Sequence, residues 1–167
     1  MEEIIERYSS ETGVKEQYKK LRMKEIVEVK QEQFEVEHEY YQRLSDGELF
    51  EPFENPDKNL EKDYALYRQK HSLLSPEEVK QIRMNYQLSV RDFSKLLGIS
   101  YSNLSTVENG SIQANYIDSL LRLAEEPLAF LHLVQQRSDL LSEKAYQDLS
   151  ARLEQLVADS KKADVAL

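Results

Sequence analysis

Residues 75–110 read SPEEVKQIRMNYQLSVRDFSKLLGISYSNLSTVENG. This stretch contains the start and stop signals of three short helices, and the first set is the clearest. Ser75 is a typical N-cap, Pro76 suits the first helical position, and Glu78 lies three residues after the cap, which completes a capping box. The sequence therefore predicts a helix that begins at Pro76.

Two more helices follow with boundaries of the same kind. Ser89 is placed to cap the second helix and Gly98 to end it, because glycine readily takes the left-handed conformation that is common at helix C-termini. Ser100 then caps a third helix, which stops at Asn109-Gly110. Two helices joined by a short turn that contains glycine form the layout of a helix-turn-helix unit.

The apolar residues of the three helices recur at spacings of three and four, which places them on one face of each helix. The residues predicted to face inward are Val79, Ile82, Phe93, Leu96, Leu97, Leu104 and Val107. Ile99 lies in the turn, and we expect it to fill the space between the second and third helices. The three helices are therefore predicted to share one apolar core.

The outer face of the third helix is left with side chains that are polar and mostly short. These residues are Tyr101, Ser102, Ser105, Thr106 and Asn109. In a DNA-binding helix-turn-helix, this helix enters the major groove and its side chains meet the base edges. We therefore expect base contacts from Tyr101, Ser102, Ser105 and Thr106. The alternative is that they are ordinary solvated residues.

This stretch resembles the helix-turn-helix of the Xre/phage-repressor superfamily, whose third helix commonly ends in Glu-Asn-Gly, as Glu108-Asn109-Gly110 does here. It is most similar to the antitoxin branch with an MqsA-type (YgiT-type) N-terminal domain. The same arrangement precedes the Panacea (SocA-like) domain in some antitoxins. In that branch a segment like residues 67–78 leads into the first helix. The resemblance is strong over residues 64–126 and extends more weakly over residues 26–156.

The resemblance implies an antitoxin-like transcriptional regulator that forms a homodimer on a palindromic double-stranded DNA operator and represses its own operon. It implies that the N-terminal half binds a cognate toxin or another protein partner. It also implies phosphate contacts from Ser89, Asn109 and the backbone at the helix starts. We expect phosphate contacts from Arg91, Lys95 and Ser100, which lie near the same helix ends. Alternatively, Arg91 and Lys95 are ordinary surface cations.

The sequence departs from the family pattern at two places. The family often has an arginine immediately before the position of Val107, where this chain has Thr106. An arginine paired with guanine contributes about 1–3 kcal/mol of discrimination, so DNA specificity is reduced here or DNA binding has been lost. MqsA-type antitoxins also carry a zinc-binding sheet domain, and this chain has no cysteine. Apolar packing must then hold the sheet together.

In the N-terminal part, the spacing of the apolar residues changes along the chain. Residues 25–42 alternate between apolar or aromatic side chains and charges, which predicts a β-hairpin with one wet face. Residues 48–53 are expected to add a short strand that Pro52 ends. Ahead of the hairpin, the spacing of apolar residues in 4–8 and 14–21 predicts two short helices, separated by Thr12-Gly13.

After a linker at residues 55–59, helices are expected throughout. A helix over 60–70 should pack on the helix-turn-helix. Asn115 is expected to cap a fourth helix, Pro127 to start another and Ser142 to cap the last. The helix after Pro127 is apolar almost all round, which predicts a dimer or interdomain contact, and the tail from Ser160 is expected to fray.

The predicted fold is therefore α+β, with a small antiparallel N-terminal sheet followed by an all-α helix-turn-helix bundle and C-terminal helices. The expected domains are residues 1–58 (sheet, partner binding), 59–137 (helix-turn-helix) and 138–167 (C-terminal helix).

Composition limits the function further. The chain has 167 residues and a net charge of −9. Residues 75–137 carry 6 basic and 7 acidic side chains, whereas residues 1–74 carry 12 and 18. The excess of acidic side chains thus lies outside the helix-turn-helix, where it would suit a basic protein partner. No apolar run approaches membrane-spanning length and the N-terminus lacks a secretory pattern, so we expect a cytoplasmic protein without membrane contact.

Nothing in the sequence points to catalysis. It contains no nucleophile elbow, phosphate-binding glycine loop or metal cluster, so we expect no enzyme activity and no cofactor. The three histidines, His38, His71 and His132, are not spaced as metal ligands, and structural roles are expected for them. Two alternatives remain: a regulator of a phage or mobile element without a toxin partner, and a protein-interaction module whose helix-turn-helix is only a scaffold.

Overall fold

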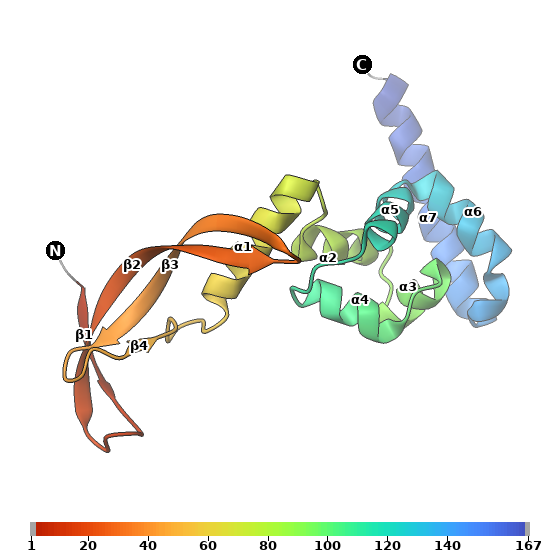
Figure 1. Cartoon of the computed structure of the whole chain (residues 1–167). Coiled ribbons are helices and arrows are strands. Elements are labelled where there is room, and N and C mark those ends of the chain that lie inside the picture. The colour runs from red at the N-terminus through yellow and green to blue at the C-terminus, as the bar shows by residue number, and fades with distance from the viewer. Residues whose placement is uncertain (1–2, 166–167) are drawn as a thin grey trace. The chain divides into compact units, whose positions relative to one another are not determined.

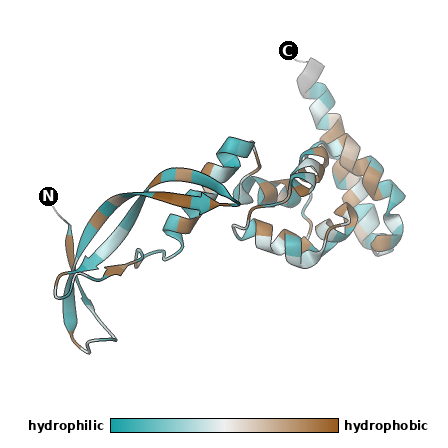
Figure 2. Cartoon of the chain, in the orientation of Figure 1, coloured by the Kyte–Doolittle hydropathy of each residue, from teal (hydrophilic) through white to brown (hydrophobic). Residues whose placement is uncertain are grey.

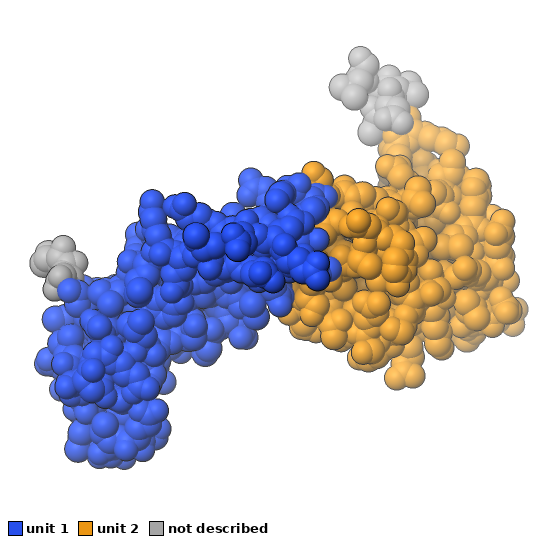
Figure 3. All heavy atoms as spheres, viewed as in Figure 1, with its two compact units in different colours: residues 1–71 blue, residues 72–167 orange. Residues whose placement is uncertain are grey.

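The computed structural model describes residues 3–165, and their side chains as far as residue 162. Its contacts divide the chain into two compact units, residues 1–71 and 72–167 (Figure 3). The first holds a four-stranded antiparallel sheet and one helix, and the second holds the remaining six α-helices of the described chain. The α+β fold class, with the sheet first and the helices after it, is confirmed.

The sheet has the strand order β1-β2-β3-β4, with neighbouring strands antiparallel. The strands are β1 Ile4–Tyr8, β2 Lys15–Val29, β3 Glu32–Arg43 and β4 Leu49–Phe50. The long twisted ribbon of Figure 1 is the β2–β3 hairpin. Lys30 and Gln31 make its turn with φ of 49° and 68°, as a two-residue hairpin loop requires. The predicted hairpin and the short strand near Pro52 are confirmed.

The prediction of two helices ahead of the hairpin is wrong, because residues 4–8 form β1 and residues 15–29 form β2. Apolar residues at 4, 5 and 8 fit a helical face, but this pattern is too short to decide. Residues 4–8 form a strand because they pair with a neighbouring strand: β1 lies antiparallel to β2, with Ile5 opposite Tyr18. Gly13, at φ +73°, lies in the turn between them.

Helix α1 (Lys58–His71) packs on β2 and β3 and belongs to the sheet unit. Asn59 binds the backbone of Glu39 in β3, and the rings of Tyr67 and Phe34 lie 6.2 Å apart. The division between the units thus falls after His71, whereas the sequence placed a boundary near residues 55–60. These contacts join residues 20 and 33 positions apart, which local patterns do not reveal.

The second unit is helical. Its elements are α2 Pro76–Asn85, α3 Val90–Leu97, α4 Tyr101–Glu108, α5 Asn115–Glu125, α6 Pro127–Gln136, a 3₁₀ turn Ser138–Leu140 and α7 Glu143–Val165. The predicted caps Ser75, Ser89 and Ser100 all accept a backbone hydrogen bond, and Ser75 with Glu78 forms the full capping box. Two boundaries differ: Ala114, not Asn115, occupies the N-cap of α5, and α7 continues past Ser160.

One apolar core holds the helical unit together. Every residue predicted to face inward from α2, α3 and α4 is buried there. Figure 2 shows hydrophobic segments on several of these helices. The apolar helix α6 packs against α5 and α7 within the unit and buries Phe130, Leu131 and Val134, while Leu128 stays exposed. Among the described residues, no helix has both the length and the apolar character needed to cross a membrane.

Candidate nucleic-acid interface

Helices α3 and α4 form the helix-turn-helix, and their N-termini are capped in the same way. The hydroxyl of Ser89 accepts a hydrogen bond from the backbone N–H of Asp92 at 3.1 Å, and that of Ser100 accepts from Asn103 at 3.1 Å. Each cap uses a first-turn donor that would otherwise lack a partner. Ser89 also donates to the Asp92 carboxylate at 2.9 Å, so both predicted phosphate-contact serines have structural roles already.

Two features favour glycine in the turn between α3 and α4. Gly98 lies at φ +74°, in the left-handed region. A Cβ at this position would also lie 3.0 Å from the guanidinium of Arg137, which donates to the carbonyl of Leu96 at 2.7 Å. Arg137, 39 positions further along the chain, thus supports the end of α3. Sequence reasoning gave no sign of this contact.

The C-terminal end of α4 is attached to α2 by an ion pair. The Nε and Nη2 atoms of Arg83 donate to the two carboxylate oxygens of Glu108, each at 2.7 Å. Both side chains are largely buried, and the hydrogen bond to Glu108 raises the pKa of Arg83. A two-pronged contact of this kind restricts orientation as well as distance. It therefore holds α4 in one orientation on the unit.

The four predicted base-contact residues lie on one face of α4. Tyr101 is 53% exposed, Ser102 and Thr106 are exposed, and Ser105 is half-buried. The hydroxyl of Thr106 donates to the carbonyl of Asn103 at 2.9 Å, and the side-chain amide of Asn109 donates to the carbonyl of Ser105 at 2.7 Å. The face thus presents a tyrosine ring and short hydroxyl side chains to its surroundings.

Two exposed cations on α3 lie beside this face. The guanidinium carbon of Arg91 is 5.8 Å from the centre of the Tyr101 ring, and Lys95 is one turn further along the helix. Neither cation has a carboxylate partner among the described side chains of residues 3–162, so their charge is available to an anion. Arg91 is thereby brought next to the first predicted base-contact residue. A polar helix face flanked by unpaired cations can approach a polyanion such as duplex DNA.

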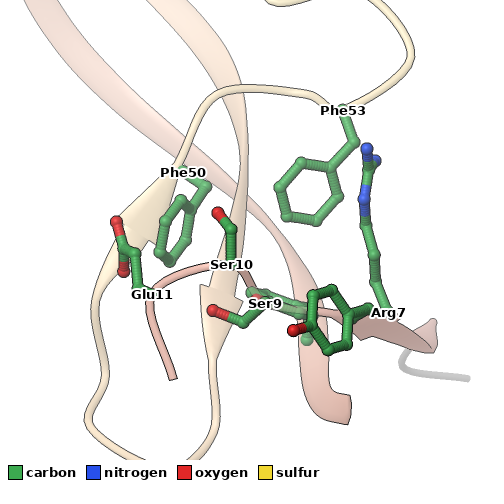
Figure 4. A pocket seen from close by; sticks show the side chains of 8 residues that line it. Arg7, Ser9, Ser10, Glu11, Phe50 and Phe53 are labelled. Carbon is green, nitrogen blue, oxygen red and sulfur yellow. The ribbon is translucent and has the colours of Figure 1, made fainter. Parts of the chain in front are cut away.

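The sheet unit holds a different feature, a pocket of about 220 Å³ at the β1–β2 and β4 end of the sheet. Figure 4 shows Phe50 and Phe53 on its wall and Arg7 beside Phe53. The guanidinium of Arg7 lies 4.5 Å from the centre of the Phe53 ring. The lining combines aromatic rings with hydroxyl groups and one carboxylate, Glu11. It offers no paired carboxylates or nucleophile–base pair of a catalytic centre.

A buried polar cluster lies between the hairpin and α1. The Nδ1 of His38 is 2.8 Å from a carboxylate oxygen of Glu25, and its Nε2 is 2.8 Å from one of Asp63. Tyr40 donates to Glu25 at 2.7 Å. Burial lowers the pKa of His38, but the hydrogen bonds to Asp63 and Glu25 outweigh burial and raise it overall. The structural role expected for His38 agrees with this burial.

The wet face of the hairpin carries both negative and positive charges. Glu35 and Glu37 are exposed, but Glu39 is buried beside Lys20 and Lys58, and Lys24 lies 3.8 Å from Glu35. Cross-strand pairs thus offset much of the negative charge.

Comparison with protein-family models, with curated proteins and with solved structures finds no match to this chain. The case for a function therefore depends on the geometry described above.

Proposed function

We propose that the protein is a DNA-binding transcriptional regulator of the antitoxin-like kind, without enzymatic activity. In this proposal the helical unit binds a double-stranded operator as a homodimer. The sheet unit binds a cognate toxin or another protein, and the assembly represses its own operon.

The observation that carries the proposal is the face of α4. Four exposed or half-buried polar residues share this face, and Arg91 and Lys95 lie unpaired on the neighbouring helix. Side chains of this kind read base edges, and cations beside them contact phosphates and position the protein on the duplex. The ion pair of Arg83 with Glu108 supports the proposal, because it gives α4 the rigidity that a groove-reading helix needs.

The direct test uses DNA from upstream of the protein's own gene in a binding titration with the full chain. The variant Ser102→Glu/Thr106→Glu places two negative charges on the proposed base-reading face. We expect it to lose site-specific binding by at least about tenfold, since each base contact contributes about 1–3 kcal/mol. The matched control is Gln135→Glu/Gln136→Glu, which adds the same charge at exposed positions of α6 and should bind as the parent does.

A second titration tests the phosphate contacts. We expect Lys95→Ala to lower the slope of log affinity against log salt by about 1, as loss of one phosphate contact does. Lys144→Ala, an exposed cation of α7, is the control. If the parent protein shows no salt-sensitive, site-specific binding, the regulator proposal fails and the interaction-module alternative is favoured.

A further inference from the structure

One long edge of the β2–β3 hairpin is covered by α1, and most of the other has no cover within the sheet unit. Helix α1 covers the outer edge of β3: Asn59 accepts from the Glu39 N–H at 3.0 Å and donates to the Glu39 carbonyl at 2.8 Å. Lys62 donates to the carbonyl of Glu37 at 2.7 Å. On the other side, β1 pairs with only the first third of β2, up to Lys19. The rest of the outer edge of β2 has no such cover within the sheet unit.

The register shows which backbone groups are left at this edge. The carbonyl of Gln17 accepts from Leu44 on the β3 side, and the N–H of Lys20 donates to Glu3 on the opposite side. Pairing of β2 with β3 then continues without a bulge, so the direction of the backbone groups alternates. The even-numbered residues Arg22, Lys24, Ile26 and Glu28 therefore point their N–H and C=O outward. None of these groups has a hydrogen-bond partner among the backbone of residues 3–165 and the described side chains of residues 3–162.

The sequence of this open edge is complementary to itself. Three of the four outward-bonding residues run Lys24, Ile26 and Glu28, with the apolar residue between opposite charges, and Arg22 precedes them. The Ile26 side chain is 72% exposed on the wet face of the hairpin. We propose that two copies of the chain pair antiparallel along this edge, with Ile26 opposite Ile26 of the second copy. Lys24 of each copy then lies opposite Glu28 of the other, and the pairing joins the two sheets into one.

Charge disfavours two alternative registers. A two-fold axis through Glu25 would place Glu25 opposite itself, and one through Lys24 would place Lys24 opposite itself. Like charges directly opposite each other destabilise an antiparallel pair, whereas opposite charges and apolar pairs stabilise it. On the α1-facing side the proposed register sets Met23 against Val29 of the second copy. Charged residues on a strand edge commonly prevent edge-to-edge pairing. That role alone does not require opposite charges placed symmetrically about Ile26.

The absence of cysteine from the chain makes a direct test simple. In the full chain, Ile26→Cys places two thiols at directly opposite positions, where Cα atoms are about 5.5 Å apart, a separation within the range of disulfides. Lys24→Cys is the matched control, because its two copies would be offset by four residues, or about 13 Å. We expect a disulfide-linked dimer from Ile26→Cys and none from Lys24→Cys. An equimolar mixture of Lys24→Cys and Glu28→Cys chains should give the mixed dimer.

A charge swap tests the same register without depending on one thiol pair. In the Ile26→Cys background, Lys24→Glu should abolish the cross-linked species, and Lys24→Glu/Glu28→Lys should restore it. Lys144→Glu makes the same charge change in α7 and should leave cross-linking intact. Unchanged circular dichroism confirms that the variants fold. Cross-linking of Ile26→Cys no faster than that of Lys24→Cys would overturn the proposal, and so would failure of the double swap to restore it. The readout involves no DNA, so it is independent of the proposed regulatory function.

Discussion

The sheet unit and the helical unit are stabilised by different kinds of buried groups. Of the described side chains, seventeen apolar ones are buried in residues 72–167, and they form one cluster. The sheet unit buries four apolar side chains and seven polar or charged ones. Among these buried polar side chains, His38 makes ion pairs with Glu25 and Asp63, and Arg43 makes them with Glu11 and Asp46. A small sheet that lacks a large apolar core thus depends on hydrogen bonds and ion pairs.

This difference should appear as different responses to mutation and pH. Apolar burial is insensitive to pH, whereas a network of ionisable groups is stable only while its members keep their charges. Hydrogen exchange measured by mass spectrometry follows peptides from each unit separately. The two units can therefore be compared within one intact chain.

The largest expected effect is in the helical core. Leu104 is fully buried, so Leu104→Ala should lower the free energy of unfolding of the helical unit by about 2–5 kcal/mol, since it removes apolar contacts and leaves a cavity. Faster exchange of α2–α6 amides measures this loss, while sheet amides should be unchanged. Leu123→Ala, at a side chain that is 63% exposed, is the control and should have little effect. Equal acceleration of exchange in the sheet would show that the units do not unfold independently.

A smaller loss is expected from the polar cluster. His38→Leu leaves the carboxylates of Glu25 and Asp63 without their imidazole partner, and an unsatisfied buried polar group costs about 1–3 kcal/mol. Exchange should accelerate in β2, β3 and α1 but not in the helical unit. His132→Leu, at an exposed position of α6, is the matched control. If His38→Leu were as stable as the parent, the sheet would not depend on its polar core.

The smallest effect is the pH dependence of the sheet. The folded state raises the pKa of His38 above its ordinary 6.5, despite burial, because Asp63 and Glu25 accept its hydrogen bonds. The stabilisation from His38 is therefore complete below pH 6.5 and is lost as pH rises through the higher folded value. The pKa of Glu25 is lowered from 4.5 by hydrogen bonds from Tyr40 and His38. Its contribution is present above pH 4.5 and is lost as pH falls through the folded value.

The sheet unit should then be most stable between those two limits and should weaken toward pH 8. The measurement is hydrogen exchange in β2 and β3 from pH 5 to 8, corrected for the intrinsic dependence of exchange on pH. The His38→Leu variant should lose the alkaline decline. A decline of the same size in that variant would assign the pH dependence to other groups.

The helical unit was largely predictable because its signals are local. Ser75, Ser89, Ser100 and Gly98 each act within a few residues of the boundary they set. The polar face of α4 follows from the same periodicity, and the predicted base-contact residues do share that face. The flanking cations were also predictable, but their freedom from carboxylate partners was not.

The sheet unit was less predictable because distant pairing decides its structure. Strand β1 has an apolar spacing that also fits a helix, and only its ladder with β2 distinguishes the two. The bond of Asn59 to the Glu39 backbone and that of Arg43 to Glu11 join residues 20 and 32 positions apart. No period or motif marks such contacts. The polar core of the sheet was therefore missed, although a structural role for His38 was anticipated.

The ion pair of Arg83 with Glu108 has an electrostatic consequence beyond its effect on orientation. Glu108 is the sole acidic side chain of α4, and the adjacent guanidinium reduces its field at a distance to that of a dipole. An approaching polyanion would then meet the cations of α3 without opposition from α4, although the chain as a whole carries an excess of negative charge. Arg83 thus neutralises the one negative charge of α4, so the positive charge near this face is that of Arg91 and Lys95 on α3.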